Sequence, residues 1–374
     1  MDRSFASALA RAEALVDGGR AGDGLAREDI RALIAGPDAG GPGGDEALFA
    51  LADRVRRLNL GDAVHLRGVI EFSNHCLRQC HYCGLRAGNH ELKRYRLTPE
   101  EIEAVAVQAR ELGYRTIVLQ SGEDPWYDGA TLARLIERVK RLTGAAVTVS
   151  VGDRSEADYR AFRAAGADRY LLKHETADAE LFARLRPGTT LAERLERLHV
   201  LRDLGFQVGS GNIVGLPGQT LDSLADDISV LRELDVEMAG IGPFIPAPGT
   251  PLASAAPGDL RLTLRVLAVA RLVLPLAHLP ATTALATLYP YGRELALKCG
   301  ANVVMPNVTP TEFRPLYRIY GNKYGMGDSA RDSRDKILRL IREVGRSVAE
   351  DQGHSPKPAF TGQTPGVTEQ TLRS

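Results

Sequence analysis

From Val64 onward, the sequence alternates short apolar runs with longer segments of helical periodicity. This alternation is typical of repeated βα units, in which each strand precedes a helix that packs on a parallel sheet. Eight runs have the character of strands: residues 64–72, 116–119, 147–151, 169–173, 207–214, 238–241, 278–281 and 302–305. Eight strands close a (β/α)8 barrel, and the alternative is a doubly wound open sheet, which uses the same alternation.

Helical segments separate these runs. Thr98 starts one of them, because Pro99 follows at the first helical position and Glu101 stands three residues on, as in a capping box. The others span residues 158–165, 191–204, 221–234, 260–274 and 293–299. The strand count favours the barrel, so we predict an α/β fold with a TIM-type (β/α)8 barrel over residues 61–320.

The two ends of the chain differ from this pattern. Residues 1–60 predict an N-terminal helical lead-in, with helices over 5–16, 27–33 and 45–58 and a Gly/Pro-rich break at 36–44. Residues 321–350 contain one short C-terminal helix, predicted over 332–344. The tail, residues 351–374, is polar and rich in Gly, Pro, Ser, Thr and Gln, so we expect it to be disordered.

The charge and hydropathy of the chain limit the kinds of partner that we expect it to bind. The 47 Lys and Arg residues balance the 47 Asp and Glu residues, so no overall field favours nucleic acid or an anionic membrane. No apolar run reaches the roughly 20 residues that cross a bilayer, and charges interrupt any signal-like core at the N-terminus. We expect a cytoplasmic protein with no nucleic-acid or membrane partner.

Three of the four cysteines, Cys76, Cys80 and Cys83, fall within eight positions directly after the first predicted strand. This position is the C-terminal rim, where barrel enzymes place their active sites. Three thiolates at this spacing hold three irons of a four-iron cluster and leave the fourth iron open. Cys299 stands alone on a predicted helix, where we expect it to be buried as a small hydrophobe.

A zinc site is the alternative for this group of cysteines. Zinc requires a fourth ligand, and the candidates are His75, His81 and His90. Zinc motifs mostly pair two C-x-x-C units, however, and this chain contains only one. A metal-binding scaffold without catalysis is the corresponding alternative for function.

The spacing C-x-x-x-C-x-x-C, with Tyr82 before the third cysteine, resembles the signature of the radical S-adenosylmethionine superfamily. The resemblance implies that one 4Fe-4S cluster binds S-adenosylmethionine through its open iron and, once reduced, cleaves it to a 5′-deoxyadenosyl radical. Such a radical must be shielded from water, and a closed barrel would provide the shield.

Within that superfamily, residues 45–320 resemble HydE, the family of iron-iron hydrogenase maturases. The stretches that carry the resemblance are IEFSNHC, CGLR, LKRYRLTPEEI, TIVLQSGED, AGADRYLLKHETA, LRPGTT, GLPGQT, GIGPFIPAPGTPLA, PATTA and GANVVMPN. The resemblance implies a small iron- or sulfur-containing substrate, an electron donor such as a ferredoxin or flavodoxin, and other hydrogenase maturases as partners. The alternatives are an amino-acid mutase that resembles methylornithine synthase, and biotin synthase, because fold alone does not select a substrate.

The same resemblance implies a set of cofactor-binding residues: Tyr82, Gln120, Ser121, Glu123, Glu175, Arg194, Gly215 and Met238. Glu175 and Arg194 would fix the methionine end of S-adenosylmethionine, while Tyr82 and Met238 would position its adenosine. Each also has a simpler explanation: Gly215 as a turn residue, Arg194 as part of a solvated face and Met238 as core filler.

For the substrate, the resemblance implies a lower cavity lined by Lys173, Thr282, Thr283, Tyr317 and Tyr320. Lys173 stands where related HydE sequences can carry arginine; it keeps the charge but loses bidentate hydrogen bonding. Some HydE proteins hold a second cluster on cysteines after the barrel. Residues 300–374 contain no cysteine, so we expect one cluster only.

Overall fold

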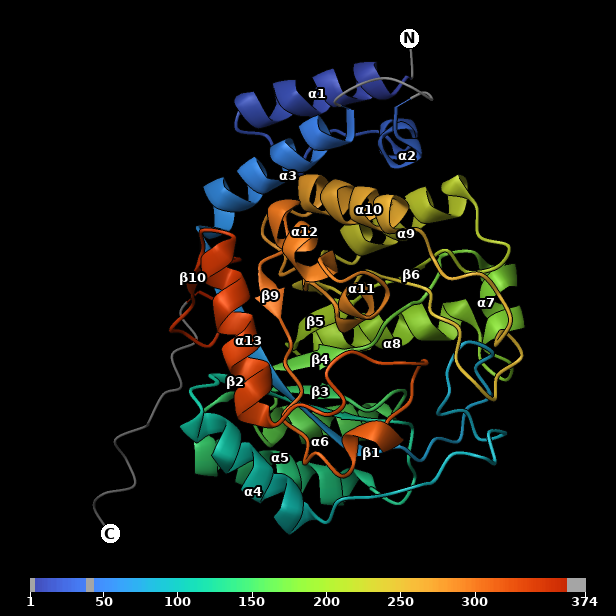
Figure 1. Ribbon diagram of the computed structural model, residues 1–374, viewed down its shortest axis with the longest axis vertical. Helices are drawn as coiled ribbons and strands as arrows, with labels where there is room; N and C mark the ends of the chain where they lie inside the picture. The colour runs from blue at the N-terminus through green and yellow to red at the C-terminus, as the bar shows by residue number, and fades with distance from the viewer. Residues whose placement is uncertain (1–3, 38–43, 362–374) are drawn as a thin grey trace.

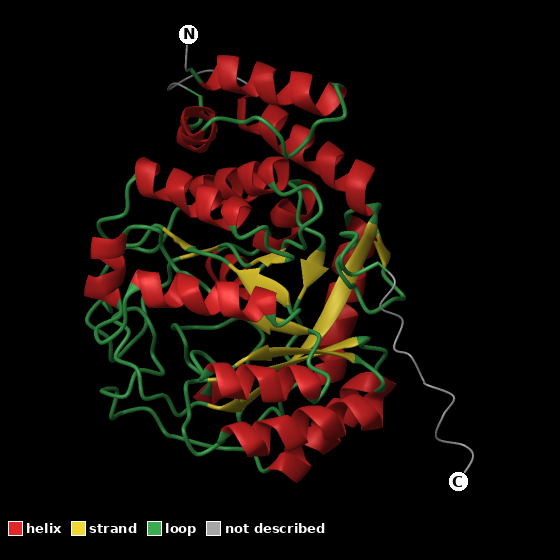
Figure 2. Cartoon of the chain, turned by 180° about the vertical axis from the view of Figure 1, so that it is seen from behind, coloured by secondary structure: helices red, strands yellow, loops and turns green. Residues whose placement is uncertain are grey.

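A computed structural model describes residues 4–37 and 44–361. Its central feature is a ring of parallel strands surrounded by helices (Figures 1 and 2). Six strands follow one another around the ring in chain order: β1 (Ala63–Ser73), β2 (Thr116–Ser121), β3 (Ala146–Ser150), β4 (Arg169–Leu171), β5 (Gln207–Ser210) and β7 (Met238–Ala239).

The ring closes through two short connections. Met238 in β7 forms a parallel bridge with His278, and Pro280 forms one with Val303. The latter residue begins β9 (Val303–Val304), which pairs with the free edge of β1. The predicted barrel is therefore confirmed, and the open sheet is excluded because both edges of the sheet are paired.

Two of the predicted strands differ from the observed ones. The run 207–214 is divided into β5 and β6 (Ile213–Val214), and β6 pairs with β8 (Gly242–Pro243) outside the ring. Gly211 separates them with a φ of 151°, and a Cβ there would lie 2.1 Å from the carbonyl oxygen of Gly240. The run 278–281 forms single bridges only, since Pro280 has no N–H to donate to a ladder.

The predicted helices are present, and four that the sequence pattern did not identify accompany them: α5, α7, α11 and the 3₁₀ helix η1 (Arg314–Leu316). Thr98 and Glu101 form the predicted capping box at α4. The full set is α1 (Phe5–Asp17), α2 (Arg27–Ala35), α3 (Gly44–Leu60), α4 (Pro99–Glu111), α5 (Gly129–Thr143), α6 (Glu156–Ala164), α7 (Ala179–Leu185), α8 (Leu191–Asp203), α9 (Leu221–Glu233), α10 (Leu260–Val273), α11 (Thr283–Leu288), α12 (Gly292–Lys298) and α13 (Ala330–Glu343).

Helices α1 to α3 pack on the outside of the barrel against α9 and α10, away from both ends of the ring (Figure 1). Buried Asp45 in α3 pairs with Arg265 in α10 at 2.6 Å, and Arg27 in α2 pairs with Asp226 in α9 at 2.5 Å. The lead-in therefore supports one side of the barrel. Most of the Gly/Pro-rich break at 36–44 lies outside the described residues.

The C-terminal segment closes the lower end of the barrel, where the strands begin. Strand β10 (Ser347–Val348) pairs with the start of β1, and the chain then crosses beneath the ring. The carbonyl oxygen of Gly353 accepts a hydrogen bond from Arg169 at 2.6 Å, and Ser355 N donates to Gln207 at 2.9 Å. The expectation of disorder from 351 is thus wrong for residues 351–361, because their backbone pairs with buried polar side chains; residues 362–374 lie outside the description.

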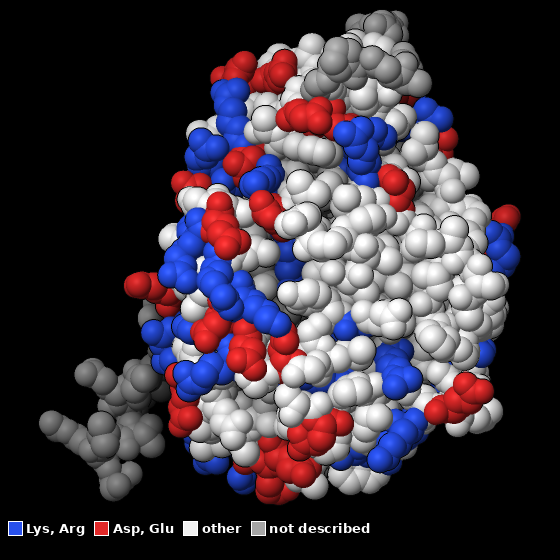
Figure 3. All heavy atoms as spheres, viewed as in Figure 1, with Lys and Arg blue, Asp and Glu red and all other residues white. Residues whose placement is uncertain are grey.

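Charge is unevenly distributed over the face seen in Figure 1. Lys, Arg, Asp and Glu side chains gather over α13, and few are visible over the loop between β8 and α10 (Figure 3). That loop belongs to the stretch 242–258, which contains no charged residue. None of the helices in the described part of the chain is long and apolar enough to span a membrane.

Candidate active site

A cavity of about 380 Å³ lies at the end of the barrel where the strands finish, and its lining is mostly apolar. Its walls include apolar side chains from five segments of the ring, namely Val69, Leu171, Met238, Pro280 and Met305. Polar side chains lie closer to the carboxyl ends of the same strands and on the loops that follow them. The cavity therefore combines an apolar lower part with a polar mouth at the carboxyl ends of the strands, the usual position of a barrel active site.

The cluster loop, residues 74–83, leaves the top of β1 and borders this cavity. Its thiols are free: Cys80 is buried, Cys76 and Cys83 are half-buried, and Cys83 lines the cavity. Burial raises the pKa of Cys83, and the neighbouring charges of Cys80 and Cys76 raise it further. The structure therefore brings the three predicted ligands together on one loop beside the cavity, with Cys83 in the cavity wall.

Three neighbouring segments hold the cluster loop in place. Leu77 N donates to Glu123 O at 3.0 Å, which ties the loop to the segment after β2. His81 N donates to Leu185 O at 2.9 Å, and Gly84 N donates to Ile319 O at 3.0 Å. Cys299 takes no part, since it is buried at the end of α12, where its Sγ lies 3.5 Å from Ala296 O.

Glu175 faces the cysteines across the cavity mouth. Its φ of 66° is unusual for a residue with a side chain, and the backbone is held there by Glu175 N bonding to Gly211 O and by Ile213 N bonding to Glu175 O. Lys173 Nζ lies 3.3 Å from Oε2 of Glu175, yet among the described residues this buried oxygen has no hydrogen-bond donor. An oriented carboxylate oxygen that lacks a donor is suited to the ammonium or hydroxyl group of a ligand.

Asp227 in α9 contacts residues that lie before and after Glu175 in the sequence. This fully buried carboxylate accepts hydrogen bonds from Ala177 N at 2.5 Å and from Asn212 Nδ2 at 2.8 Å. His174 also points its ring toward Asp227. Burial raises the pKa of Asp227, and the charge and hydrogen bond of His174 act in the opposite direction.

A second charged cluster stands behind the cysteines. Arg194 donates to Asp153 at 3.0 Å and to Lys173 O at 3.2 Å, and Arg186 donates to the Tyr82 hydroxyl at 3.1 Å. Glu123 in turn pairs with Arg78 and Arg186. The surplus of arginine over carboxylate gives this part of the site a positive charge, which suits a ligand carboxylate.

The cavity gathers some of the predicted site residues and not others. Its wall includes Tyr82, Cys83, Gln120, Lys173, Glu175, Met238, Thr282, Thr283 and Tyr320. Outside the wall are Cys76, Cys80, Ser121, Glu123, Arg194, Gly215 and Tyr317. Within that second group, Tyr317 touches the wall indirectly, since Gln120 donates to its hydroxyl at 3.3 Å. Gly215 shapes a turn with a φ of 88°.

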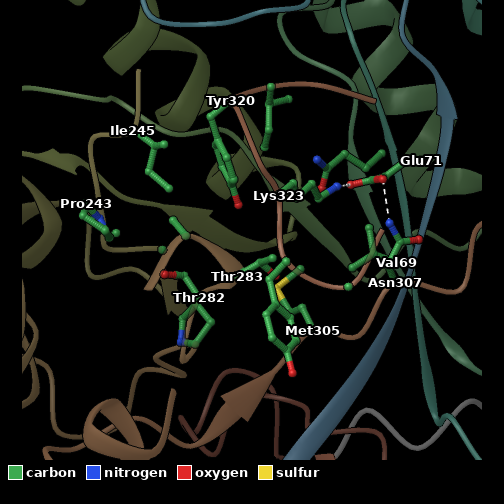
Figure 4. A pocket seen from close by; sticks show the side chains of 18 of the residues that line it. Val69, Glu71, Pro243, Ile245, Thr282, Thr283, Met305, Asn307, Tyr320 and Lys323 are labelled. Atoms are coloured by element: carbon green, nitrogen blue, oxygen red, sulfur yellow. Dashed lines mark hydrogen bonds and ion pairs between the residues drawn. The ribbon is translucent and has the colours of Figure 1, made fainter. Parts of the chain in front are cut away.

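The sequence reasoning missed a polar group on the β1 side of the cavity. Glu71 forms an ion pair with Lys323 and accepts a hydrogen bond from Asn307 Nδ2 at 2.7 Å (Figure 4). Both charged side chains are buried, and Lys323 Nζ lies 5.1 Å from the centre of the Tyr317 ring. Glu71 could have been found as one of two charged residues, with Arg67, inside an apolar strand. Lys323 lies outside regular elements and gave no signal, and Asn307 ends the quoted stretch GANVVMPN.

Comparison with known proteins supports this picture. Residues 70–231 match the model of the Radical SAM superfamily. The chain is 49% identical to FeFe hydrogenase maturase subunit HydE of Thermotoga maritima, over 83% of this chain and 89% of that protein. It is 28% identical to 3-methylornithine synthase of Methanosarcina acetivorans, over 91% and 93% of the two chains. The crystal structure of methylornithine synthase PylB superposes with a TM-score of 0.78, at 27% identity, over 90% of this chain and 97% of that chain.

Barrel, cluster loop and superfamily match together define a radical S-adenosylmethionine enzyme, whose cofactors are a 4Fe-4S cluster and S-adenosylmethionine. Within this class, the chain belongs to the HydE family. When bound, the cluster supplies one electron for cleavage of S-adenosylmethionine to a 5′-deoxyadenosyl radical that acts on a small-molecule substrate.

The arrangement of side chains fits these cofactors. In the described part of the chain, no three His, Cys, Asp or Glu side chains converge on one metal ion, and in a four-iron cluster each thiolate binds a different iron. The charge of Glu175 raises the pKa of both Cys80 and Cys83, so its carboxylate lies within electrostatic reach of the cluster loop.

Proposed function

We propose that this enzyme acts on a small iron- or sulfur-containing substrate during assembly of the di-iron centre of an iron-iron hydrogenase. The observation that carries the proposal is the 49% identity to the Thermotoga maturase, which extends over 89% of that protein. The cavity beside the cluster loop supports it, because its volume of about 380 Å³ suits a small molecule and not a macromolecule.

In this proposal, Cys76, Cys80 and Cys83 hold the cluster. Glu175 receives the amino or hydroxyl groups of S-adenosylmethionine on its buried Oε2, which lies 3.3 Å from Lys173 Nζ and accepts no hydrogen bond from the described residues. Arg194 and Glu123 act through their ion pairs and set the charge behind the methionine end. Ser121 and Gly215 shape the loops on which these groups stand.

The remaining cavity residues are assigned either to the cofactor or to the substrate. Tyr82 and Met238 would lie against the adenosyl part of the cofactor and Gln120 against its methionine part, since all three line the cavity. Lys173, Thr282, Thr283 and Tyr320 would contact the substrate, with Tyr317 supporting them through Gln120. The cation of Lys173 favours a substrate with anionic or strongly polar ligands.

We further propose an acidic one-electron carrier, a ferredoxin or flavodoxin, as the reductant. Residues 74–96 contain five Lys or Arg residues and one Glu in a chain whose net charge is zero. Leu77, beside the first cysteine, is 51% exposed and offers an apolar contact. A cytoplasmic location, which keeps thiols reduced, and cooperation with other maturases complete the proposal.

Two experiments test the function in sequence. The protein is reconstituted anaerobically with iron and sulfide, reduced with dithionite, and assayed for 5′-deoxyadenosine with S-adenosylmethionine alone and with lysine added. It is then supplied to a hydrogenase maturation system that lacks only its HydE component, and hydrogen evolution is measured. Restored hydrogenase activity supports the proposal; methylornithine formation from lysine without such restoration would replace it with a mutase.

A further inference from the structure

A segment after the cluster loop runs back along the start of that loop. Arg96 forms an antiparallel bridge with Ser73, the last residue of β1. Tyr95 N donates to Asn74 Oδ1 at 2.8 Å, and Asn74 Nδ2 donates to Lys93 O at 2.8 Å. The segment 93–96 is therefore fixed to Asn74, which lies two residues before Cys76.

Arg94, in the middle of this segment, binds the cluster loop and the turn that follows it through backbone carbonyl groups. Its Nη1 donates to Asn74 O at 2.6 Å and to Leu85 O at 2.9 Å. Its Nη2 donates to Arg86 O at 2.7 Å and to Asn89 O at 3.2 Å. One acceptor precedes Cys76 and three follow Cys83 in the sequence, so a single guanidinium group joins the two ends of the cysteine-bearing segment.

The charge of Arg94 differs from that of its neighbours in having no carboxylate partner. Arg78 pairs with Glu123, and Arg96 pairs with Asp124 at 2.7 Å. Among the described residues, no Asp or Glu lies within ion-pair distance of the Arg94 guanidinium, whose hydrogen bonds all go to carbonyl oxygens. A cation that is not neutralised locally acts on the nearest groups that can become negative.

Those groups are the cysteine thiols and the cluster that they would hold. Arg94 Nη1 binds the carbonyl oxygens of Asn74 and Leu85, which lie two residues before Cys76 and two residues after Cys83. A fixed cation in this position stabilises negative charge on the cysteine-bearing loop.

We propose that Arg94 is the positioning residue of the cluster loop and that its uncompensated charge raises the reduction potential of the bound cluster. Reduction adds one electron to the cluster, and a nearby fixed cation stabilises the more negative state. Hydrogen bonds and charges around a metal centre tune its potential in this way without touching the metal. The inference goes beyond the proposed function, because it concerns the cluster and holds whatever the substrate is.

The test separates the two parts of the role with three variants of the full-length reconstituted protein. Arg94→Lys keeps the positive charge but loses the forked arrangement of guanidinium donors, and Arg94→Met loses both the charge and the fork. Lys93→Met is the matched control, since it removes the same formal charge from an adjacent, exposed side chain. Iron and sulfide content are measured first, and the midpoint potential follows from a dithionite titration monitored by electron paramagnetic resonance.

We expect both Arg94 variants to hold less iron than the wild type and only Arg94→Met to shift the potential. That shift should be to a more negative value, of the order of a tenfold change in the reduced-to-oxidised ratio, which corresponds to about 59 mV for a one-electron couple. Lys93→Met should match the wild type in both measurements.

Other outcomes would overturn the proposal. A wild-type potential in Arg94→Met, or an equal shift in Lys93→Met, refutes the role of the charge, while full iron content in Arg94→Lys refutes the role of the fork. If Arg94→Met holds no cluster, Arg94→Gln takes its place, because its amide retains two donors without the charge. The same potential readings then decide the question.

Discussion

Nε2 of His174 lies 3.4 Å from Oδ1 of Asp227, and both side chains are completely buried. His174 directly precedes Glu175, whose left-handed backbone conformation must be maintained by its surroundings. Asp227 supplies much of that support, because it also accepts hydrogen bonds from Ala177 N and Asn212 on either side.

Replacing Asp227 should therefore affect both stability and cofactor binding. Asp227→Ala leaves buried donors unpaired, and we expect it to lower the free energy of unfolding by about 3 kcal/mol. It should also weaken binding of S-adenosylmethionine through Glu175. Asp226→Ala is the control, because the neighbouring Asp226 makes an exposed ion pair worth about 1 kcal/mol or less. Urea unfolding and equilibrium dialysis measure both effects, and equal losses in the two variants would contradict the expectation.

The buried pair of Glu71 and Lys323 should behave as one unit. Lys323→Met leaves the Glu71 carboxylate with Asn307 but without a cation, and Glu71→Gln leaves the ammonium without an anion. We expect each single variant to lose about 3 kcal/mol of unfolding free energy and the double variant to lose less than the sum of the two. A double-mutant cycle by urea unfolding measures the coupling, and strictly additive losses would show that the pair is not coupled.

Acid should weaken the lower end of the barrel. Burial, reinforced by the charge of Arg67, lowers the pKa of His65 to about 4. In the unfolded chain the same imidazole takes a proton near pH 6.5, so stability is full above that value and falls as the pH drops from about 6.5 towards 4.

The expected contribution of His65 is a loss of about 1 kcal/mol between pH 7 and pH 5, allowing for partial solvent screening. His65→Gln should reduce the pH dependence of the unfolding free energy by that amount. The variant His199→Gln, at an exposed position on α8, serves as the control and should keep the wild-type profile. A His65→Gln profile that parallels the wild type would be inconsistent with this assignment.

The C-terminal segment should be required for the stability of the barrel. A chain that ends at Glu350 loses two acceptors of Arg169 Nη2, namely the carbonyl oxygens of Gln352 and Gly353. We expect it to lose at least about 3 kcal/mol of unfolding free energy, because buried guanidinium donors are left unpaired. A chain that ends at Thr361 is the reference, as it keeps these contacts. Equal unfolding midpoints in urea would show that the segment does not support the barrel.

Only the clustered cysteines should bind iron. Cys80→Ala should lose most of the iron after reconstitution, whereas Cys299→Ala should keep the wild-type content and lose about 1 kcal/mol of stability from a small cavity. Iron analysis and urea unfolding make the comparison. Loss of iron in Cys299→Ala with the fold intact would give Cys299 a role in the cluster that its position on α12 does not suggest.

Local sequence patterns account for much of what could be predicted about the fold and the site. The spacing of Cys76, Cys80 and Cys83 and the alternation of apolar runs with helical segments depend on neighbours in the chain, so both can be read from the sequence. The structure confirms the barrel and shows the three cysteines as free thiols. The capping box of Thr98 and Glu101 is equally local. Failures occurred where a local pattern was overridden, as at Pro280, whose stretch forms bridges and not a regular strand.

Contacts between distant segments were decided by the tertiary structure alone. Glu71 meets Lys323, Gly353 meets Arg169, and Asp227 meets His174 only because closing the barrel brings strand ends and the C-terminal segment together. Burial then makes these polar pairs necessary, since a lone charge inside the barrel would lose its hydration without compensation. The sequence by itself determined the chemistry of the cluster loop and the order of the strands, and three-dimensional packing determined which charges surround them.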